Sequence, residues 1–540
     1  MTVTIFSPFL LATLLALAAG PLLYTVARRQ ASLLSFLDGF VMVSIAGLVG
    51  LEVVPGTFTA GGGWSLVFLG LGLFGPTLLE RGFRAVEREA HIATLMLAII
   101  GLVLHAVADG TVLVPGTGAG VDAWALPLSV VLHSLPVGMA VWWLLAPGFG
   151  VWPPLLTLVA MGLGTVAGIH FGASISDLLG TQAWAWFQSL VAGSILHVVF
   201  GRPHLHPHDE HEAADHAPSA PHYEGLGNVI ALLALAGIAA MHTTVPDQAG
   251  WFDRVLVLAL ASAPALLLAY VIGGFLYGEL PEPVLRWLIA LFVSLPLLGV
   301  EMTVIRVAGA ALLVLLVVAS KTSKGTLPIE SASKGTLPIE GASKGTLPIE
   351  GQRGASPLRG SAGMRWRAAL RAGFVDLVDG TAPWIVLGIA IAAAAEPFLT
   401  QMPWAQWPDS VEVVLFALLG MPLYICAAGI TPLIAVLLAA GVSPGAALAF
   451  LLTGPATLGM LRRLHGSALA WRFAVVAAAG AVAMGLAVNL LPAPSLPVLD
   501  HAAEQSSWLQ QLSLVLLALL YAGSLLRRGA RASLSELYEG

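Results

Sequence analysis

The sequence predicts an all-α polytopic integral membrane protein, and three observations support this fold class. Hydrophobic residues make up 58% of the 540 residues and charged residues only 10%, whereas a soluble domain carries about 25% charged residues. Apolar windows of about 18–25 residues recur along the chain, the length that one helical crossing of a bilayer requires. The mean hydropathy of +0.89 leaves little of the chain for soluble domains.

The apolar windows predict about 14–16 transmembrane helices. In the first two thirds of the chain they lie near residues 5–27, 33–54, 63–79, 92–114, 125–146, 152–172, 183–200, 226–242, 252–275, 284–300 and 303–320. In the last third they lie near 382–399, 411–440, 444–460, 468–491 and 508–526. Prolines interrupt the region 411–460, so we expect broken or re-entrant helices in the C-terminal half.

Basic residues predict how these helices are oriented. Arginines and all lysines fall in alternate connections between the windows, whereas the connections 55–62 and 400–410 contain neither residue type. Because basic loops stay on the cytoplasmic side, the basic connections are assigned to the cytoplasm. The expected location is therefore the cell inner membrane, which the chain crosses many times.

Two polar interruptions divide the chain into four predicted parts. Residues 1–243 form an eight-helix transmembrane domain with a His-rich loop at 202–224, and residues 244–320 form a second helical segment. A cytoplasmic linker at 321–364 contains three ten-residue copies that begin SKGTLPIE, and residues 365–540 form the last segment. Gly and Pro in every copy favour a flexible spacer, with a partner-docking array as the alternative.

Ionisable residues inside the N-terminal windows indicate a metal site. Ionisable groups at this depth are expensive unless they are paired, hydrated or metal-bound. His105 and Asp109 are one helical turn apart and can chelate a divalent transition metal from one helix face. His133 lies in the following window, and Glu52 is a weaker candidate near a membrane surface. The alternative is that the histidines are buried packing residues that hydrogen-bond Ser or backbone groups.

The His-rich loop offers further metal ligands on the predicted cytoplasmic side. Alternating His residues next to acidic ones suit weak and exchangeable binding of zinc, nickel or copper. The candidate ligands in this loop are His204, His206, His208 and His211. A solvated spacer without a metal role is the alternative.

With the motifs H-A-V-A-D-G at residue 105 and H-S-L-P-V-G at residue 133, residues 1–243 resemble the ZIP family of zinc and iron transporters. The resemblance implies eight helices, external termini and a metal site built from the fourth and fifth helices. It makes His105, Asp109 and His133 the expected ligands. Family members commonly hold two metals, but Ala106 and Ser134 replace the Asn and Glu of those motifs. We therefore expect a single site.

The C-terminal half contains a candidate substrate path along interrupted helices. Paired broken segments at membrane depth are the best sequence indication of a transporter's substrate site. Cys426, the single cysteine of the chain, could offer sulfur to copper, zinc or trivalent arsenic, or could be buried and inert. The candidate path residues are Pro422, Cys426, Pro432, Ser443, Pro444, Gly445, Thr453, Gly454, Pro455 and Thr457. Glu301 and Arg306 are expected to form a structural ion pair.

The C-terminal half also carries a family resemblance. It rests on G-M-P-L-Y-I-C ending at Cys426, on G-V-S-P-G-A-A-L-A-F-L-L from Gly441, and on T-G-P-A-T from Thr453. With these motifs residues 365–531 resemble a broad bacterial permease family that includes organoarsenical efflux proteins and proposed copper/zinc exporters. The resemblance implies two repeats. Residues 244–320 would then be a shortened first repeat, because they contain no cysteine motif, and residues 365–540 the second.

These observations predict a membrane permease that exports a divalent transition metal, zinc or copper. The alternatives are efflux of arsenite or an organoarsenical, and a metal sensor or membrane scaffold that does not transport. No nucleophile–base pair occurs in the apolar windows, so no enzyme activity is expected. No cofactor beyond the transported metal ion is expected, and no basic patch indicates nucleic acid. The expected partners are the lipid bilayer and the metal ion, and a homo-oligomer is left open.

Overall fold

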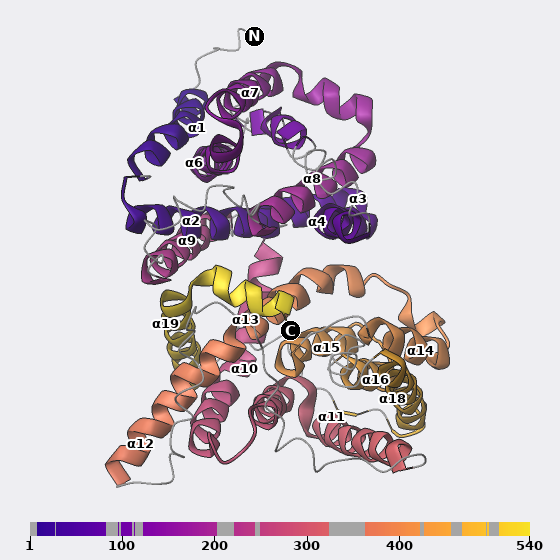
Figure 1. The fold of residues 1–540 in the computed structure, drawn as a ribbon. Coiled ribbons are helices and arrows are strands. Elements are labelled where there is room, and N and C mark those ends of the chain that lie inside the picture. Colours follow the sequence, from indigo (N-terminus) through magenta and orange to yellow (C-terminus); the bar gives the residue numbers. More distant parts are fainter. Residues whose placement is uncertain are drawn as a thin grey trace. The chain divides into compact units, whose positions relative to one another are not determined.

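The structure is a computed structural model, and its secondary structure is helical throughout the described residues (Figure 1). It describes residues 8–27, 29–82, 96, 99–107, 109–110, 113, 122–201, 221–242, 249–322, 362–421, 426–454, 467–492, 494–495 and 507–539. Within these ranges there is no strand, and an isolated bridge joins Tyr277 and Leu280. The predicted all-α fold class is therefore confirmed.

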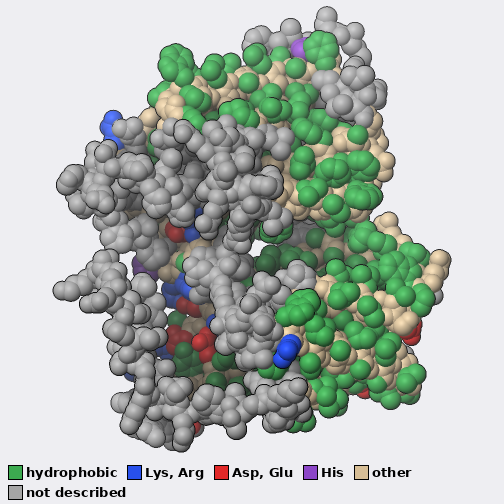
Figure 2. All heavy atoms as spheres, turned by 45° about the vertical axis from the view of Figure 1, so that its right-hand side comes forward, with side chains coloured by type: hydrophobic (Ala, Val, Ile, Leu, Met, Phe, Trp, Pro, Cys, Tyr) green, Lys and Arg blue, Asp and Glu red, His purple; other side chains and the backbone are tan. Residues whose placement is uncertain are grey.

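Seven helices in the described ranges are long and apolar enough to cross a membrane. Many of their side chains expose hydrophobic surface, as Leu22, Leu163 and Leu519 do at 66%, 65% and 65% exposure. Figure 2 shows hydrophobic side chains over much of the visible face. Apolar surface of this extent suits contact with lipid and not with water. The polytopic membrane class is thus confirmed, while the total of 14–16 crossings and the inner-membrane location stay predictions.

The chain divides into two compact units. Unit 1 comprises residues 1–253 and 522–536, and unit 2 comprises residues 254–521 and 537–540. Residues 522–536 of the last helix therefore belong to the same unit as the N-terminal segment. The division after Asp253 lies ten residues beyond the boundary drawn from the sequence at residue 243. The finer four-part division stays a prediction.

Unit 1 is a bundle of helices that pack in pairs. Its helices are α1 (Pro8–Ala27), α2 (Ala31–Leu48), the π-helix η1 (Val49–Val53), α3 (Val54–Gly61), α4 (Trp64–Gly82), α6 (Asp122–Phe149), α7 (Trp152–Leu179), α8 (Thr181–Gly201) and α9 (Pro221–His242). The main packed pairs are α1 with α6, α2 with α9 and α4 with α8. Gly20 meets the backbone of Gly138, and Gly72 meets that of Gly193. Such small residues let membrane helices approach backbone to backbone.

The last helix, α19 (Trp508–Glu539), closes unit 1 with an ion pair. It bends at Gly529, whose φ of 75° is accessible to glycine without strain. Beyond the bend, the Arg531 guanidinium donates two hydrogen bonds of 2.7 Å to the carboxylate of Asp38, which is only 6% exposed. The backbone N–H of Arg531 donates to Glu224 at 3.0 Å. A bidentate, buried pair of this kind holds the end of the chain in place.

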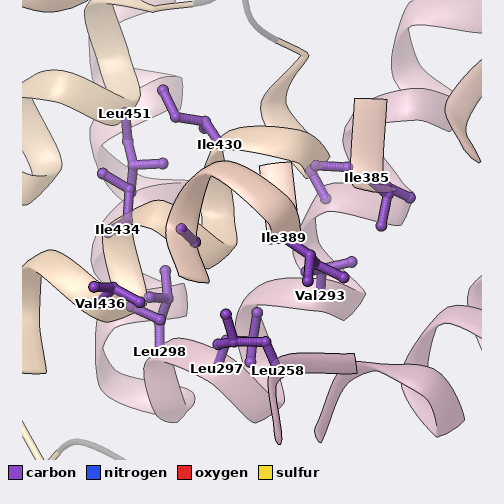
Figure 3. Packing of buried hydrophobic residues seen from close by; sticks show 14 of the residues in the cluster. Leu258, Val293, Leu297, Leu298, Ile385, Ile389, Ile430, Ile434, Val436 and Leu451 are labelled. Carbon is purple, nitrogen blue, oxygen red and sulfur yellow. The ribbon is translucent and has the colours of Figure 1, made fainter. Parts of the chain in front are cut away.

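Unit 2 surrounds a large hydrophobic core and contains a smaller hydrophobic cluster. Its helices are α10 (Ala249–Leu276), α11 (Glu282–Thr322), α12 (Ala362–Arg371), the π-helix η4 (Ala372–Leu377), α13 (Val378–Leu399), the 3₁₀ turn η5 (Trp404–Gln406), α14 (Asp409–Gly420), α15 (Ala427–Ala439), α16 (Pro444–Thr453), α18 (Ser467–Val488) and the first part of α19. Figure 3 shows the core side chains of α10, α11, α13, α15 and α16. Branched aliphatic residues on these helices exclude water from the centre of the unit. The smaller cluster lies between α11, α16 and α18.

Helix α11 is broken in its middle. Gly299 adopts φ 80° and ψ 169°, outside the helical region, so the 41-residue helix consists of two parts. The sequence predicted two windows here, 284–300 and 303–320, and the break at Gly299 lies where the first of them ends. The break matters for the site because Ser294 and Arg306 come from opposite sides of it.

Candidate functional site

Three consecutive helices of unit 2 are too short to cross a bilayer alone. Helices α14, α15 and α16 contain 12, 13 and 10 residues, and at 1.5 Å per residue the longest spans about 20 Å. A hydrocarbon core is about 30 Å thick. Helices α15 and α16 are nevertheless almost entirely buried. Such half-helices occur at membrane depth where protein or a cavity satisfies their backbone ends.

The N-terminal end of α16 is satisfied by the protein itself. The Ser443 hydroxyl accepts a hydrogen bond from the N–H of Ala446, and Pro444 occupies the first turn. The buried Glu412 carboxylate accepts from the Ser443 N–H at 2.9 Å, and the Asn489 side-chain oxygen accepts from the Gly445 N–H at 2.7 Å. Ser443, Pro444 and Gly445, proposed as path residues, therefore begin and cap a helix in the structure.

The N-terminal end of α15 is built differently. Cys426 is the residue before its first turn, with φ −56° and ψ 138°, and among the described residues no side chain caps this end. The thiol is half-buried. It interacts electrostatically with Arg306 of α11 and with Tyr270 of α10. The chain thus places its one cysteine where a half-helix begins, next to a guanidinium.

Arg306 is the most deeply buried cation described in unit 2, with 2% of its surface exposed. Its guanidinium donates to the Ser294 hydroxyl, to the Thr431 hydroxyl at 2.9 Å and to the Ala427 carbonyl at 2.9 Å. It therefore connects both parts of the broken α11 to the first turn of α15. All three acceptors are neutral.

A second set of hydrogen-bonded hydroxyl groups lies in the same core and includes Tyr270, which interacts electrostatically with the Cys426 thiol. The Tyr270 hydroxyl lies 2.9 Å from that of Thr381 in α13 and 3.1 Å from that of Tyr521 in α19. Tyr270 itself is fully buried. We call the connected polar side chains of this region the Cys426 cluster: Tyr270, Ser294, Arg306, Thr381, Cys426, Thr431 and Tyr521. Five helices contribute to this cluster inside an otherwise apolar core.

The expected ion pair between Glu301 and Arg306 is wrong. Glu301 is exposed, and its carboxylate accepts a hydrogen bond from the Ser495 N–H at 2.7 Å. Residues five apart on an α-helix do not share a face, whereas those three or four apart do. Arg306 therefore points into the core while Glu301 points away from it.

The other proposed path residues have structural roles or lie outside the described residues. Pro432 is buried within α15. The Thr453 hydroxyl donates to the Ala449 carbonyl of its own helix at 3.0 Å and packs against Gly420, and Gly454 follows it at the C-terminal end of α16. Pro422, Pro455 and Thr457 lie outside the described residues.

In unit 1, the structure brings together two of the proposed metal ligands. His105 Nε2 lies 3.5 Å from Asp109 Oδ1, one turn further along. His105 also lines a mostly apolar cavity of about 90 Å³, together with Trp184, Phe187 and Gln188 of α8. Among the described residues no group of three or more His, Cys, Asp or Glu side chains gathers around a point where a metal could bind.

The remaining proposed ligands cannot be placed as side chains. His133 belongs to α6 and Glu52 to the π-helix η1, and only their backbones are described. His204, His206, His208 and His211 lie outside the described residues. The three-ligand site of His105, Asp109 and His133 therefore stays a prediction.

Sequence reasoning missed most of the Cys426 cluster. Tyr270 and Tyr521 are single tyrosines within predicted apolar windows, and a tyrosine in such a window does not by itself indicate a functional site. Glu412 was missed although it is a buried acid, because it falls near the start of a window. Arg306 did carry a signal, since an ionisable residue inside a membrane window marks a functional site by default.

Comparison with known proteins supports the permease reading of unit 2. Residues 283–490 match ArsP_1, a family of predicted permeases. This range contains Arg306, Cys426, α14, α15 and α16. No curated protein and no solved structure matches the chain. The comparisons give no support for the ZIP resemblance of residues 1–243, which stays a prediction. The family match and the seven apolar helices support a multi-pass membrane permease and point to a transporter and not an enzyme.

Proposed function

We propose that the protein exports a thiol-reactive trivalent arsenical past the Cys426 cluster. The observation that carries the proposal is the position of the single cysteine, at the open end of a buried half-helix. Half-helix ends at membrane depth are where transporters bind their substrates. The match of residues 283–490 to predicted permeases supports transport by this unit.

The charge of the cluster favours an arsenical, which carries no positive charge, over a bare Zn²⁺ or Cu²⁺ ion. A soft thiol is a suitable ligand for either kind of substrate. The guanidinium of Arg306, however, would repel a divalent cation close to Cys426. The arsenic centre of a trivalent arsenical with two hydroxyl groups is neutral, so it meets no such repulsion. The thiol would displace one hydroxyl, forming an arsenic–sulfur bond and releasing one water, and water would reverse the step on exit.

Transport into everted membrane vesicles tests this proposal, with phenylarsonous acid as the substrate. Cys426→Ser should reduce the uptake rate by roughly tenfold, the effect of losing an interaction of ~1.4 kcal/mol. Ala439→Ser is the matched control because it adds a serine at the exposed end of the same helix. Uptake by Cys426→Ser at the wild-type rate would contradict the proposal.

Export of zinc or copper is the second candidate, and one observation in unit 1 favours it. The His105–Asp109 pair, at 3.5 Å, lies where His105 lines the cavity. An imidazole and a carboxylate are ordinary zinc ligands, with His133 as the proposed third.

Zinc flux in proteoliposomes tests the second candidate. The double variant with His105→Ala and His133→Ala should abolish flux and bound zinc, whereas His170→Ala, an exposed histidine on α7, should not. Unchanged flux in the double variant would exclude this site. If neither zinc nor the arsenical moves, the sensor or scaffold alternative becomes the better explanation.

A further inference from the structure

Within the described part of the chain no carboxylate pairs with the buried guanidinium of Arg306, and the Cys426 thiol is the group with which it interacts electrostatically. The three hydrogen bonds of the guanidinium all end on neutral oxygens. Four acids of unit 2 have other partners: Glu282 binds Arg286, Glu396 binds Arg254, Glu301 binds the Ser495 N–H and Glu412 binds the Ser443 N–H. Burying an uncompensated charge is expensive, so such a group calls for an explanation.

Arg306 also has hydrogen-bonding capacity left. A guanidinium carries five N–H donors in a planar fork. Three hydrogen bonds to Ser294, Thr431 and Ala427 use three of them. No side chain or carbonyl of the described residues is placed as an acceptor for the other two donors. Paired oxygens of a carboxylate or of a phosphate-like group match this geometry well.

A second source of positive potential lies at the same place. The first turn of an α-helix presents N–H groups without partners in the helix, and its N-terminus carries a partial positive charge. At α15 this end is next to Cys426 and Arg306 and has no side-chain cap among the described residues. At α16 the equivalent end is capped by Glu412, Asn489 and Ser443. The contrast leaves positive potential at the Cys426 cluster.

We propose that Arg306 binds an anionic oxygen group of the substrate held at the Cys426 cluster. This inference deepens the proposed function, because it assigns the substrate a class: a small molecule with both a thiol-reactive centre and an oxyanion such as a carboxylate or a phosphonate. The hydroxyls of Tyr270 and Thr381, which hydrogen-bond each other, are neutral members of the same cluster. The positive cluster excludes free metal cations.

The single cysteine allows a direct test in the purified full-length protein. Cys426 is modified with two methanethiosulfonate reagents of similar size, one carrying a sulfonate and one a trimethylammonium group. In each reaction the thiolate sulfur forms a disulfide with the reagent, and methanesulfinate leaves. Mass spectrometry follows both rates, and Cys426→Ser gives the background. The wild type should react faster with the anionic reagent by about tenfold, the scale on which local potential changes encounter rates.

Variants of Arg306 connect this preference to its charge. Arg306→Gln should reduce the rate ratio to near one, and Arg306→Lys should keep most of it. Arg286→Gln is the matched control, because Arg286 lies on the same helix but is paired with Glu282. A ratio that stays unchanged in Arg306→Gln, or a wild type that prefers the cationic reagent, would overturn the proposal.

A measurement on the wild type keeps the test independent of how the variants fold. Sodium methylphosphonate should slow alkylation of Cys426 by neutral N-ethylmaleimide, and uncharged dimethyl sulfone should not. Equal rates with and without methylphosphonate would overturn the proposal. These readouts need no transport. A failure of arsenical uptake with an intact charge preference would therefore refute the proposed function alone, and the reverse result would refute the anion site alone.

Discussion

The two half-helices α15 and α16 follow one another in the chain, yet their N-terminal ends are completed in opposite ways. At α16 a carboxylate, an amide and a hydroxyl accept the hydrogen bonds of the first turn. At α15 a thiol and a guanidinium lie at the equivalent position, and among the described residues no side chain caps the helix. The first end is closed by the protein, and the second is the end at which we propose that the substrate binds. Because α15 and α16 are both buried, burial alone does not indicate which of the two helix ends is the candidate site.

The largest loss of stability is expected at the capped N-terminal end of α16, where the packing leaves no room for an added methyl group. A methyl group added by Gly445→Ala would collide with the Gly485 carbonyl and with the Asn489 side chain. Overpacking combined with the lost cap should reduce the free energy of unfolding by about 3 kcal/mol, measured by SDS denaturation in mixed micelles. Gly70→Ala, where the added methyl meets open space, should change it by less than about 1 kcal/mol.

Removing Glu412 from the capped end of α16 should cause the next largest loss of stability. Glu412→Ala leaves the Ser443 N–H without its acceptor, so the free energy of unfolding should fall by about 2 kcal/mol in the same assay. Asp409→Ala, an exposed acid on the same helix, should cost about 0.5 kcal/mol. Equal losses in the two variants would show that Glu412 does not cap α16.

The smallest change in stability is expected from removing Arg306 beside the N-terminal end of α15. Arg306→Met removes a buried charge that pairs with no carboxylate among the described residues, and Ser294 and Thr431 still donate to their own helices. Without ligand, the free energy of unfolding should change by less than about 1 kcal/mol. Arg531→Met, which removes both hydrogen bonds to the buried Asp38, should cost about 3 kcal/mol. A large loss in Arg306→Met would make Arg306 a structural residue.

Much of the fold could be predicted from the sequence because membranes impose simple rules. Apolar windows identified the helical class, and the break at Gly299 lies near the end of a predicted window. Prolines near 432 and 444 indicated broken helices in the region that contains α15 and α16. These features depend on local composition, which the sequence displays directly.

The site was less predictable because its members come from five helices. Cys426 could be singled out as a lone soft ligand. Arg306 was noticed but assigned to Glu301, since sequence proximity suggested a partner that the helix geometry forbids. Tyr270 and Tyr521 meet across 251 positions, and no local pattern reports such a pairing. The His105–Asp109 pair was predictable because a single helical turn separates its members.

The ion pair that closes unit 1 has a consequence for biosynthesis. Asp38 and Arg531 are 493 positions apart, and a ribosome adds about 5–20 residues per second. The N-terminal bundle therefore waits roughly 25–100 s for Arg531. Until then the Asp38 carboxylate lacks the two hydrogen bonds that the Arg531 guanidinium donates, so this contact forms only after nearly the whole chain has been synthesised.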